Sequence, residues 1–146
     1  MTTERAQLKV SHRYPVPADK IFDAFLDPAK ARHFFFATET GEMIKSEIDP
    51  RVGGKYVMID KRPEMGEVEH AGEYLEISRP KKLSFTFGLP KLSPEIDTVT
   101  LEFSPKGGGC EVVLTYDYNA RFKSSEDKIV SGWRTVLQGV LPSLTA

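Results

Sequence analysis

Cysteine and long apolar runs are scarce in this chain of 146 residues. Cys110 is the single cysteine, so no internal disulfide can form. No segment approaches the roughly 18 consecutive apolar residues of a transmembrane helix, and no apolar leader of the signal-peptide type opens the sequence. We therefore predict a cytoplasmic protein that neither spans nor binds a membrane.

The chain also lacks an excess of charge of one sign. Its net charge is −1, whereas a protein that tracks the phosphates of a nucleic acid carries a basic surplus. The sequence therefore predicts no nucleic-acid partner. Hydrophobic residues make up 40% and charged residues 28% of the chain, which are globular proportions. At this length we predict one domain over residues 1–146.

Motifs for cofactors, metals and covalent catalysis are absent from the sequence. There is no glycine-rich nucleotide signature, and the glycine run 107–109 lies between two predicted strands, as a hairpin turn does. His12, His33 and His70 are isolated in sequence, without the spacing of a zinc site. The sequence therefore predicts no cofactor and no metal ion.

The strongest pattern that is present predicts an amphipathic helix from Ser124 to Leu141. Its apolar residues fall in one arc: Ile129, Val130, Trp133, Val136, Leu137, Val140 and Leu141. Ser124 is the expected N-cap, and Pro142 is expected to end the helix. Gly132 and Gly139 each cost helix propensity, which predicts that another backbone approaches closely at both.

The rest of the sequence alternates as half-buried strands do. A strand at Leu8–Tyr14 is followed by two short helices, one from Pro17 to the residue before Pro28 and one from there to about Phe34. Six further strands are predicted at 42–48, 55–61, 68–77, 83–88, 98–103 and 111–116, with Gly72 as a bulge or bend. Short turns join these strands, so they should form an antiparallel meander.

One long helix and a curved sheet together predict a pocket. A helix is only about 10–12 Å wide, so a seven-stranded sheet wrapped around it should leave space at one end. The residues expected to line this space are Phe35, Tyr56, Met58, Phe85, Phe87, Leu101, Tyr116, Trp133 and Leu137. At least one of Phe34–Phe36 should lie on a cavity wall, at a lid or at the surface, where it would support a homodimer; a small core under a loop is the alternative.

The order and spacing of several motifs resemble a known family. These motifs are residues 22–28 (FDAFLDP), 49–54 (DPRVGG), 72–77 (GEYLEI), 82–87 (KLSFTF) and Gly132-Trp133. Together they look like the Aha-type family (activator of heat-shock protein 90 ATPase homologue) of the START and pollen-allergen-like superfamily, over about residues 8–142. The resemblance implies an α+β helix-grip fold with a hydrophobic cavity between the sheet and the C-terminal helix.

The resemblance implies no single function, and three hypotheses remain open. The first is a protein that binds a small apolar or amphipathic molecule. The second is a module that interacts with a heat-shock chaperone; the eukaryotic co-chaperones carry an additional N-terminal domain, whereas this sequence starts directly at the first strand. The third is a cyclase or hydrolase that uses a cavity side chain, with Glu47, His70 and Glu73 as candidates whose orientation depends on strand register.

Overall fold

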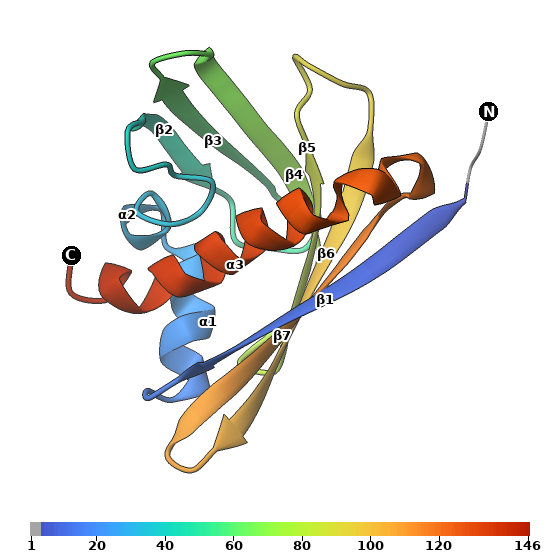
Figure 1. The fold of residues 1–146 in the computed structure, drawn as a ribbon. Helices are drawn as coiled ribbons and strands as arrows, with labels where there is room; N and C mark the ends of the chain where they lie inside the picture. The colour runs from blue at the N-terminus through green and yellow to red at the C-terminus, as the bar shows by residue number, and fades with distance from the viewer. Residues whose placement is uncertain (1–3) are drawn as a thin grey trace.

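The computed structural model describes residues 4–146 and shows, over these residues, seven strands in one antiparallel sheet with helices against its concave face (Figure 1). The elements are β1 (Arg5–Tyr14), α1 (Ala18–Leu26), α2 (Pro28–Ala31), β2 (Glu42–Ile48), β3 (Lys55–Arg62), β4 (Gly66–Ser78), β5 (Lys82–Gly88), β6 (Ile96–Lys106), β7 (Gly109–Asn119), the 3₁₀ helix η1 (Ala120–Ser125) and α3 (Glu126–Ser143). Among the helices of these described residues, none has the length and apolar character needed to cross a bilayer.

The strand order confirms the predicted meander. The order is β1-β7-β6-β5-β4-β3-β2, so β2 to β7 each pair with the next strand along the chain. The first strand, β1, forms the other edge of the sheet and pairs with β7, from Arg5 opposite Asn119 to Tyr14 opposite Cys110. Together with the long helix, this arrangement confirms the α+β helix-grip architecture that the sequence predicts.

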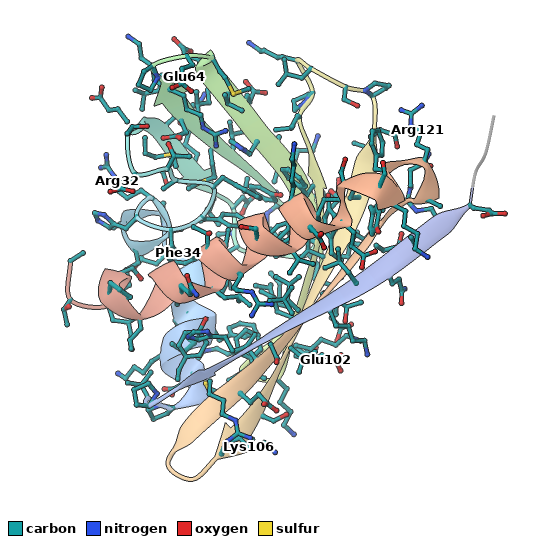
Figure 2. All side chains as sticks on the ribbon, viewed as in Figure 1. Arg32, Phe34, Glu64, Glu102, Lys106 and Arg121 are labelled. Carbon is teal, nitrogen blue, oxygen red and sulfur yellow. The ribbon has the colours of Figure 1, made fainter. Side chains whose placement is uncertain are left out.

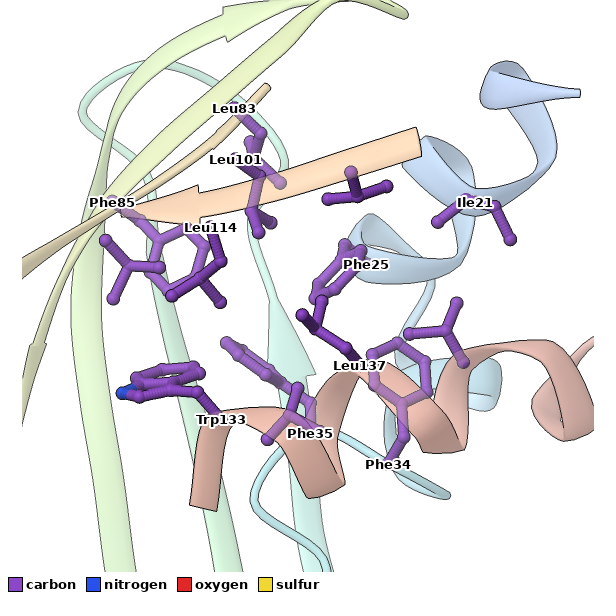
Figure 3. Close-up of a cluster of buried hydrophobic side chains, with 14 of the residues drawn as sticks. Ile21, Phe25, Phe34, Phe35, Leu83, Phe85, Leu101, Leu114, Trp133 and Leu137 are labelled. Atoms are coloured by element: carbon purple, nitrogen blue, oxygen red, sulfur yellow. The ribbon is translucent and has the colours of Figure 1, made fainter. Parts of the chain in front are cut away.

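The core lies between the curved sheet and α3, which runs across the concave face (Figure 1). Figure 3 shows Trp133 and Leu137 of α3 in one cluster with Phe85, Leu101 and Leu114 of the sheet, between the helix and the strands. A buried hydrogen bond of 2.6 Å from the Tyr14 hydroxyl to the Leu137 carbonyl links β1 to the helix. Apolar burial supplies most of the stabilisation, and this bond fixes how the helix sits on the sheet.

The two short helices cover the end of the core next to the C-terminal half of α3 (Figure 1). Ile21, Phe22 and Phe25 of α1 are buried there. The Asp27 side chain caps α2 by accepting from the Ala29 amide at 2.9 Å. The second helix ends at Ala31, earlier than the predicted Phe34, because the chain must turn for Phe34 and Phe35 to enter the core.

Both predicted ends of the long helix need correction. The helix begins at Glu126, not at Ser124, because 120–125 form η1, which Asn119 caps by accepting from the Arg121 amide at 3.0 Å. At the other end the helix continues through Pro142 to Ser143. Pro142 removes only the bond to the carbonyl four residues earlier, and that residue, Gln138, is exposed to water, which can take its place.

The predicted close approach holds at one helical glycine and fails at the other. A Cβ on Gly139 would lie 2.7 Å from the Phe34 Cβ, whereas a Cβ on Gly132 would meet nothing within 4 Å. In the sheet, a Cβ on Gly72 would lie 1.9 Å from the Thr86 carbonyl oxygen, so Gly72 allows β5 to approach. The bulge predicted there is instead between Tyr74 and Glu76.

Candidate functional site

A pocket of about 460 Å³ lies between the first half of α3 and the sheet. We call it the helix–sheet pocket. Its lining residues are Phe36, Ala37, Thr38, Arg62, Met65, Val68, His70, Phe87, Leu89, Leu92, Tyr116, Lys128, Ile129, Gly132, Trp133, Thr135 and Val136. They come from the loop after α2, from β3 to β5 and β7, from the loop after β5, and from α3, so the fold itself brings distant segments together here.

Stacked aromatic rings form one wall of the helix–sheet pocket. The Phe36 ring lies flat against His70, with centroids 4.5 Å apart, and against Phe87 at 4.7 Å. Trp133 meets the Phe36 ring edge-on, at 5.5 Å between centroids. Phe36 has a φ of 63°, a left-handed conformation that a non-glycine residue rarely adopts. The backbone is therefore held in a costly shape that turns this ring into the wall.

A partly buried ion pair between Asp60 and Arg62 holds the loop that carries Phe36. Asp60 is 1% exposed and accepts from the Thr38 hydroxyl at 2.7 Å and from Arg62 Nε at 3.0 Å. Arg62 in turn donates through Nη2 to the Phe36 carbonyl at 3.3 Å. Asp60 thus fixes both Arg62 and the loop. Its other oxygen, Oδ1, has no hydrogen-bond partner among residues 4–146.

His70 is a neutral imidazole in the pocket wall. The side chain is 4% exposed, and burial lowers its pKa from 6.5 to about 4, although its hydrogen bond to the Met58 carbonyl opposes the shift. That carbonyl, 3.2 Å from Nδ1, can only accept, so Nδ1 carries the proton and Nε2 is an acceptor. At neutral pH His70 therefore adds no charge to the pocket.

A tyrosine and a carboxylate lie where the pocket adjoins a second hollow. The Tyr116 hydroxyl donates to Asp97, which also accepts from Arg5 Nη2 at 3.4 Å. Burial raises the pKa of Asp97, while Tyr116 and Arg5 partly offset the rise. The second hollow, of about 310 Å³, contains Asp97 and shares four lining residues with the helix–sheet pocket: Phe87, Leu89, Tyr116 and Ile129. The carboxylate already has partners and lies outside the lining of the helix–sheet pocket.

The nine residues predicted to line the pocket fall into two groups. Phe87, Tyr116 and Trp133 line it. The other six are buried in the core and are absent from its lining: Phe35, Tyr56, Met58, Phe85, Leu101 and Leu137. Of the three consecutive phenylalanines the sequence predicts Phe35 at the pocket, whereas Phe36 lines it. Phe34 and Phe35 are buried and Phe36 is half-buried, so none of the three offers the exposed ring on which a homodimer was expected.

The register of the strands separates the three candidate catalytic side chains. His70 lines the pocket, whereas Glu47 and Glu73 are exposed. Arg62 and Lys128 also line it and were not predicted. Lys128 lies on the polar side of the helical wheel, so only its place near the start of the docked helix brings it to the pocket. Across residues 4–146, no group of three or more His, Cys, Asp or Glu side chains is placed to hold a metal ion.

Solved structures with the same fold come from several bacteria. CV1439 from Chromobacterium violaceum has a TM-score of 0.80 at 22% identity, over 96% of this chain and 97% of that one. NE0264 from Nitrosomonas europaea has a TM-score of 0.81 at 20% identity, over 95% and 94%. SA2116 from Staphylococcus aureus, a protein of unknown function, has a TM-score of 0.83 at 16% identity, over 97% and 94%. These likenesses show the fold.

A family model adds what the structural likeness alone does not. No curated protein matches the chain. The model described as "Activator of Hsp90 ATPase homolog 1-like protein" matches residues 15–144, which include every helix and strand of the described residues except β1. The chain belongs to this Aha1-like family of the START and pollen-allergen-like (SRPBCC) superfamily.

Proposed function

We propose that this protein binds a small apolar or amphipathic molecule in the helix–sheet pocket. The observation that carries the proposal is the pocket itself, whose volume of about 460 Å³ falls within the usual 300–1,000 Å³ range of small-molecule sites. Its walls are mostly aromatic and aliphatic, with a smaller number of polar groups that include those of Arg62, His70, Tyr116 and Lys128. Burial of apolar ligand surface supplies the affinity, and the polar groups orient the ligand.

The geometry favours binding over catalysis in this pocket. His70 is the one candidate base of the three that lines it, and its pKa of about 4 makes it a weak base at neutral pH. Glu47 and Glu73, which a cyclase or hydrolase would need inside, are exposed. An enzyme in this pocket would therefore depend on a single histidine with little driving force for proton abstraction.

Trp133 provides a direct test because it is the single tryptophan of the chain and lines the pocket. Titration with a fatty acid or an environment-sensitive dye is expected to change its emission saturably at a 1:1 ratio. Native mass spectrometry of the purified protein checks the same proposal independently through a retained small molecule. Absence of saturable binding across a library of lipids and aromatic compounds would overturn it.

A second candidate function is an interaction with a heat-shock chaperone through the outer surface. The family description, which names the activation of a chaperone ATPase, favours it. The discriminating measurement is chaperone ATPase activity with increasing amounts of this protein, with and without a pocket ligand. Stimulation that is insensitive to the ligand would support this function, and no effect at high concentration would remove it.

A further inference from the structure

We infer that the ligand of the helix–sheet pocket is an anionic amphiphile, with an apolar body against the aromatic wall and a carboxylate or similar head toward Arg62 and Lys128. This inference rests on the proposed binding function and adds the charge of the ligand. It comes from the polar groups of the pocket that the protein leaves without partners, because a ligand must satisfy or at least tolerate those groups.

The charged side chains of the pocket are all cationic. Arg62 and Lys128 line it, and its lining contains no aspartate or glutamate among residues 4–146. Asp60 balances Arg62, but Lys128 has no ion-pair partner in the described part of the chain. Because His70 is neutral at pH 7, the pocket has a surplus of positive charge next to a low-dielectric aromatic wall.

Three hydrogen-bonding groups without partners, all of them donors, point to the same chemistry; His70 Nε2 is an acceptor and is not one of them. Among residues 4–146, the Trp133 indole N–H, Arg62 Nη1 and the Lys128 ammonium donate to no protein acceptor, and all three side chains line the pocket. Each of these groups is a donor only, so none can accept a bond from the ligand. A carboxylate, which accepts only, matches them, whereas an ammonium head would face uncompensated donors.

Arg62 is positioned in advance for this role. Its Nε is held by Asp60 at 3.0 Å and its Nη2 by the Phe36 carbonyl at 3.3 Å, which leaves Nη1 available. The side chain is 24% exposed, so its position is fixed while water still reaches it. A guanidinium already held in place loses little conformational freedom when an anion binds. The same contacts join the head-group site to the loop that carries Phe36.

The test compares three ligands with the same ten-carbon tail: decanoate, decan-1-ol and decylammonium. Each is titrated into the full-length protein at pH 7 and low salt, with Trp133 emission as the signal. Decanoate is expected to bind roughly tenfold more tightly than decan-1-ol, because its carboxylate accepts charge-assisted hydrogen bonds from the cationic side chains. Decylammonium is expected to bind more weakly than the alcohol. Added salt should narrow the difference between decanoate and decan-1-ol.

Variants at the two cations locate the head group. Lys128→Gln, at an exposed helical position, should weaken decanoate binding about threefold and weaken decan-1-ol binding less than decanoate binding. Arg62→Gln should weaken decanoate binding about tenfold, and Arg62→Lys should restore part of that loss. The matched control is Lys106→Gln, which removes the same charge from a residue outside the pocket lining. Figure 2 shows Lys106 near the β6–β7 turn, far from Arg121 of η1, the helix that leads into the pocket-lining half of α3.

The outcomes separate this inference from the proposed function. If decan-1-ol or decylammonium binds as tightly as decanoate, the charge assignment is wrong and the binding function stands. The same conclusion follows if decanoate affinity is unchanged in Lys128→Gln and in a folded Arg62→Gln protein. If none of the three ligands alters Trp133 emission or binds by calorimetry, the inference fails, and the titration with the library of lipids and aromatic compounds decides whether the proposed function fails as well.

Discussion

The two halves of α3 lie in contrasting surroundings. Toward its C-terminus, Leu137 and Val140 are fully buried, and Gly139 lies against Phe34. Toward its N-terminus, Gly132 has open space around it and Trp133 borders the helix–sheet pocket. Two short helices cover the first region, whereas the second is bounded by loops and strand ends (Figure 1). One helix therefore contributes to a close-packed core and to a pocket wall.

This contrast shows where the fold obtains its stability and where it leaves room for a ligand. Close-packed apolar side chains resist changes of volume, so substitutions in the covered region should cost free energy of unfolding. Side chains around the pocket have partners on one side only, so substitutions there should affect binding more than stability. Neighbouring residues in the two regions allow the contrast to be tested with matched changes.

The largest effect is expected at two consecutive phenylalanines. Phe35 is 1% exposed, and its ring centroid lies 5.1 Å from that of Tyr56 and 5.5 Å from that of Phe85. Phe35→Ala should therefore lower the free energy of unfolding by about 3–5 kcal/mol. Phe36 is half-buried with a φ of 63°, so Phe36→Ala should cost less than about 2 kcal/mol. Urea unfolding of both variants measures the difference.

Ligand binding should rank these two variants in the opposite order to stability. Phe36→Ala removes the ring that stacks on His70 and Phe87, so it should weaken ligand binding in a protein that remains folded. Where Phe35→Ala still folds, its pocket should bind with nearly unchanged affinity. Equal stability losses in the two variants would mean that the pocket wall is as tightly packed as the core.

The next effect is the pH dependence that His70 imparts. Its pKa is about 4 in the folded protein and 6.5 as the ordinary value, so the unfolded chain binds more protons between these values. The stabilisation from the neutral, buried ring is complete above pH 6.5, decreases as the pH falls and is lost below pH 4. The total is about 3 kcal/mol, from 1.36 kcal/mol per pKa unit.

The variant His70→Gln isolates this contribution from the carboxylates that also titrate in acid. Urea unfolding of both proteins between pH 7 and pH 4 gives two stability profiles. The wild-type protein should lose stability relative to the variant as the pH falls, by up to about 3 kcal/mol across this interval. Parallel profiles would show that the imidazole is not held neutral by burial.

Most of the fold follows from the sequence because its signals are local and repeated. Alternating residues such as Val112, Leu114 and Tyr116 specify which strand face is buried, and short turns leave the meander as the simple connection. Helix ends were predicted less well. Ser124 resembles an N-cap, yet the chain first forms η1, and this competition between two helical geometries has no distinct sequence pattern.

The sequence names some of the residues that line the helix–sheet pocket and not others. An inward strand position such as Phe85 or Phe87 has the same alternation, but Phe85 lies under Phe35, whereas Phe87 lies at the open end. That difference depends on where the loop after α2 covers the sheet, which is a long-range property. Arg62 and Lys128 were missed because a charged residue near a strand end or on a polar helix face is usually solvated.

A smaller effect is expected at the glycine in the covered half of α3. A Cβ at Gly139 would lie 2.7 Å from the Phe34 Cβ, which is too close for a real contact, so either the helix or the loop must shift. Gly139→Ala should therefore lower the free energy of unfolding by about 1–3 kcal/mol, despite the better helix propensity of alanine. Urea unfolding provides the measurement, and a stabilised variant would mean that Phe34 moves aside without cost.

The smallest effect, of opposite sign, is expected one heptad earlier at Gly132. A Cβ there meets nothing within 4 Å, so Gly132→Ala should stabilise the helix by about 0.5–1 kcal/mol. The same methyl group adds to the pocket wall, so it should reduce the affinity for a bulky ligand while the protein becomes more stable. The same urea unfolding, followed by a Trp133 titration, measures both quantities. Destabilisation at Gly132 equal to that at Gly139 would show that the two halves of α3 are packed alike.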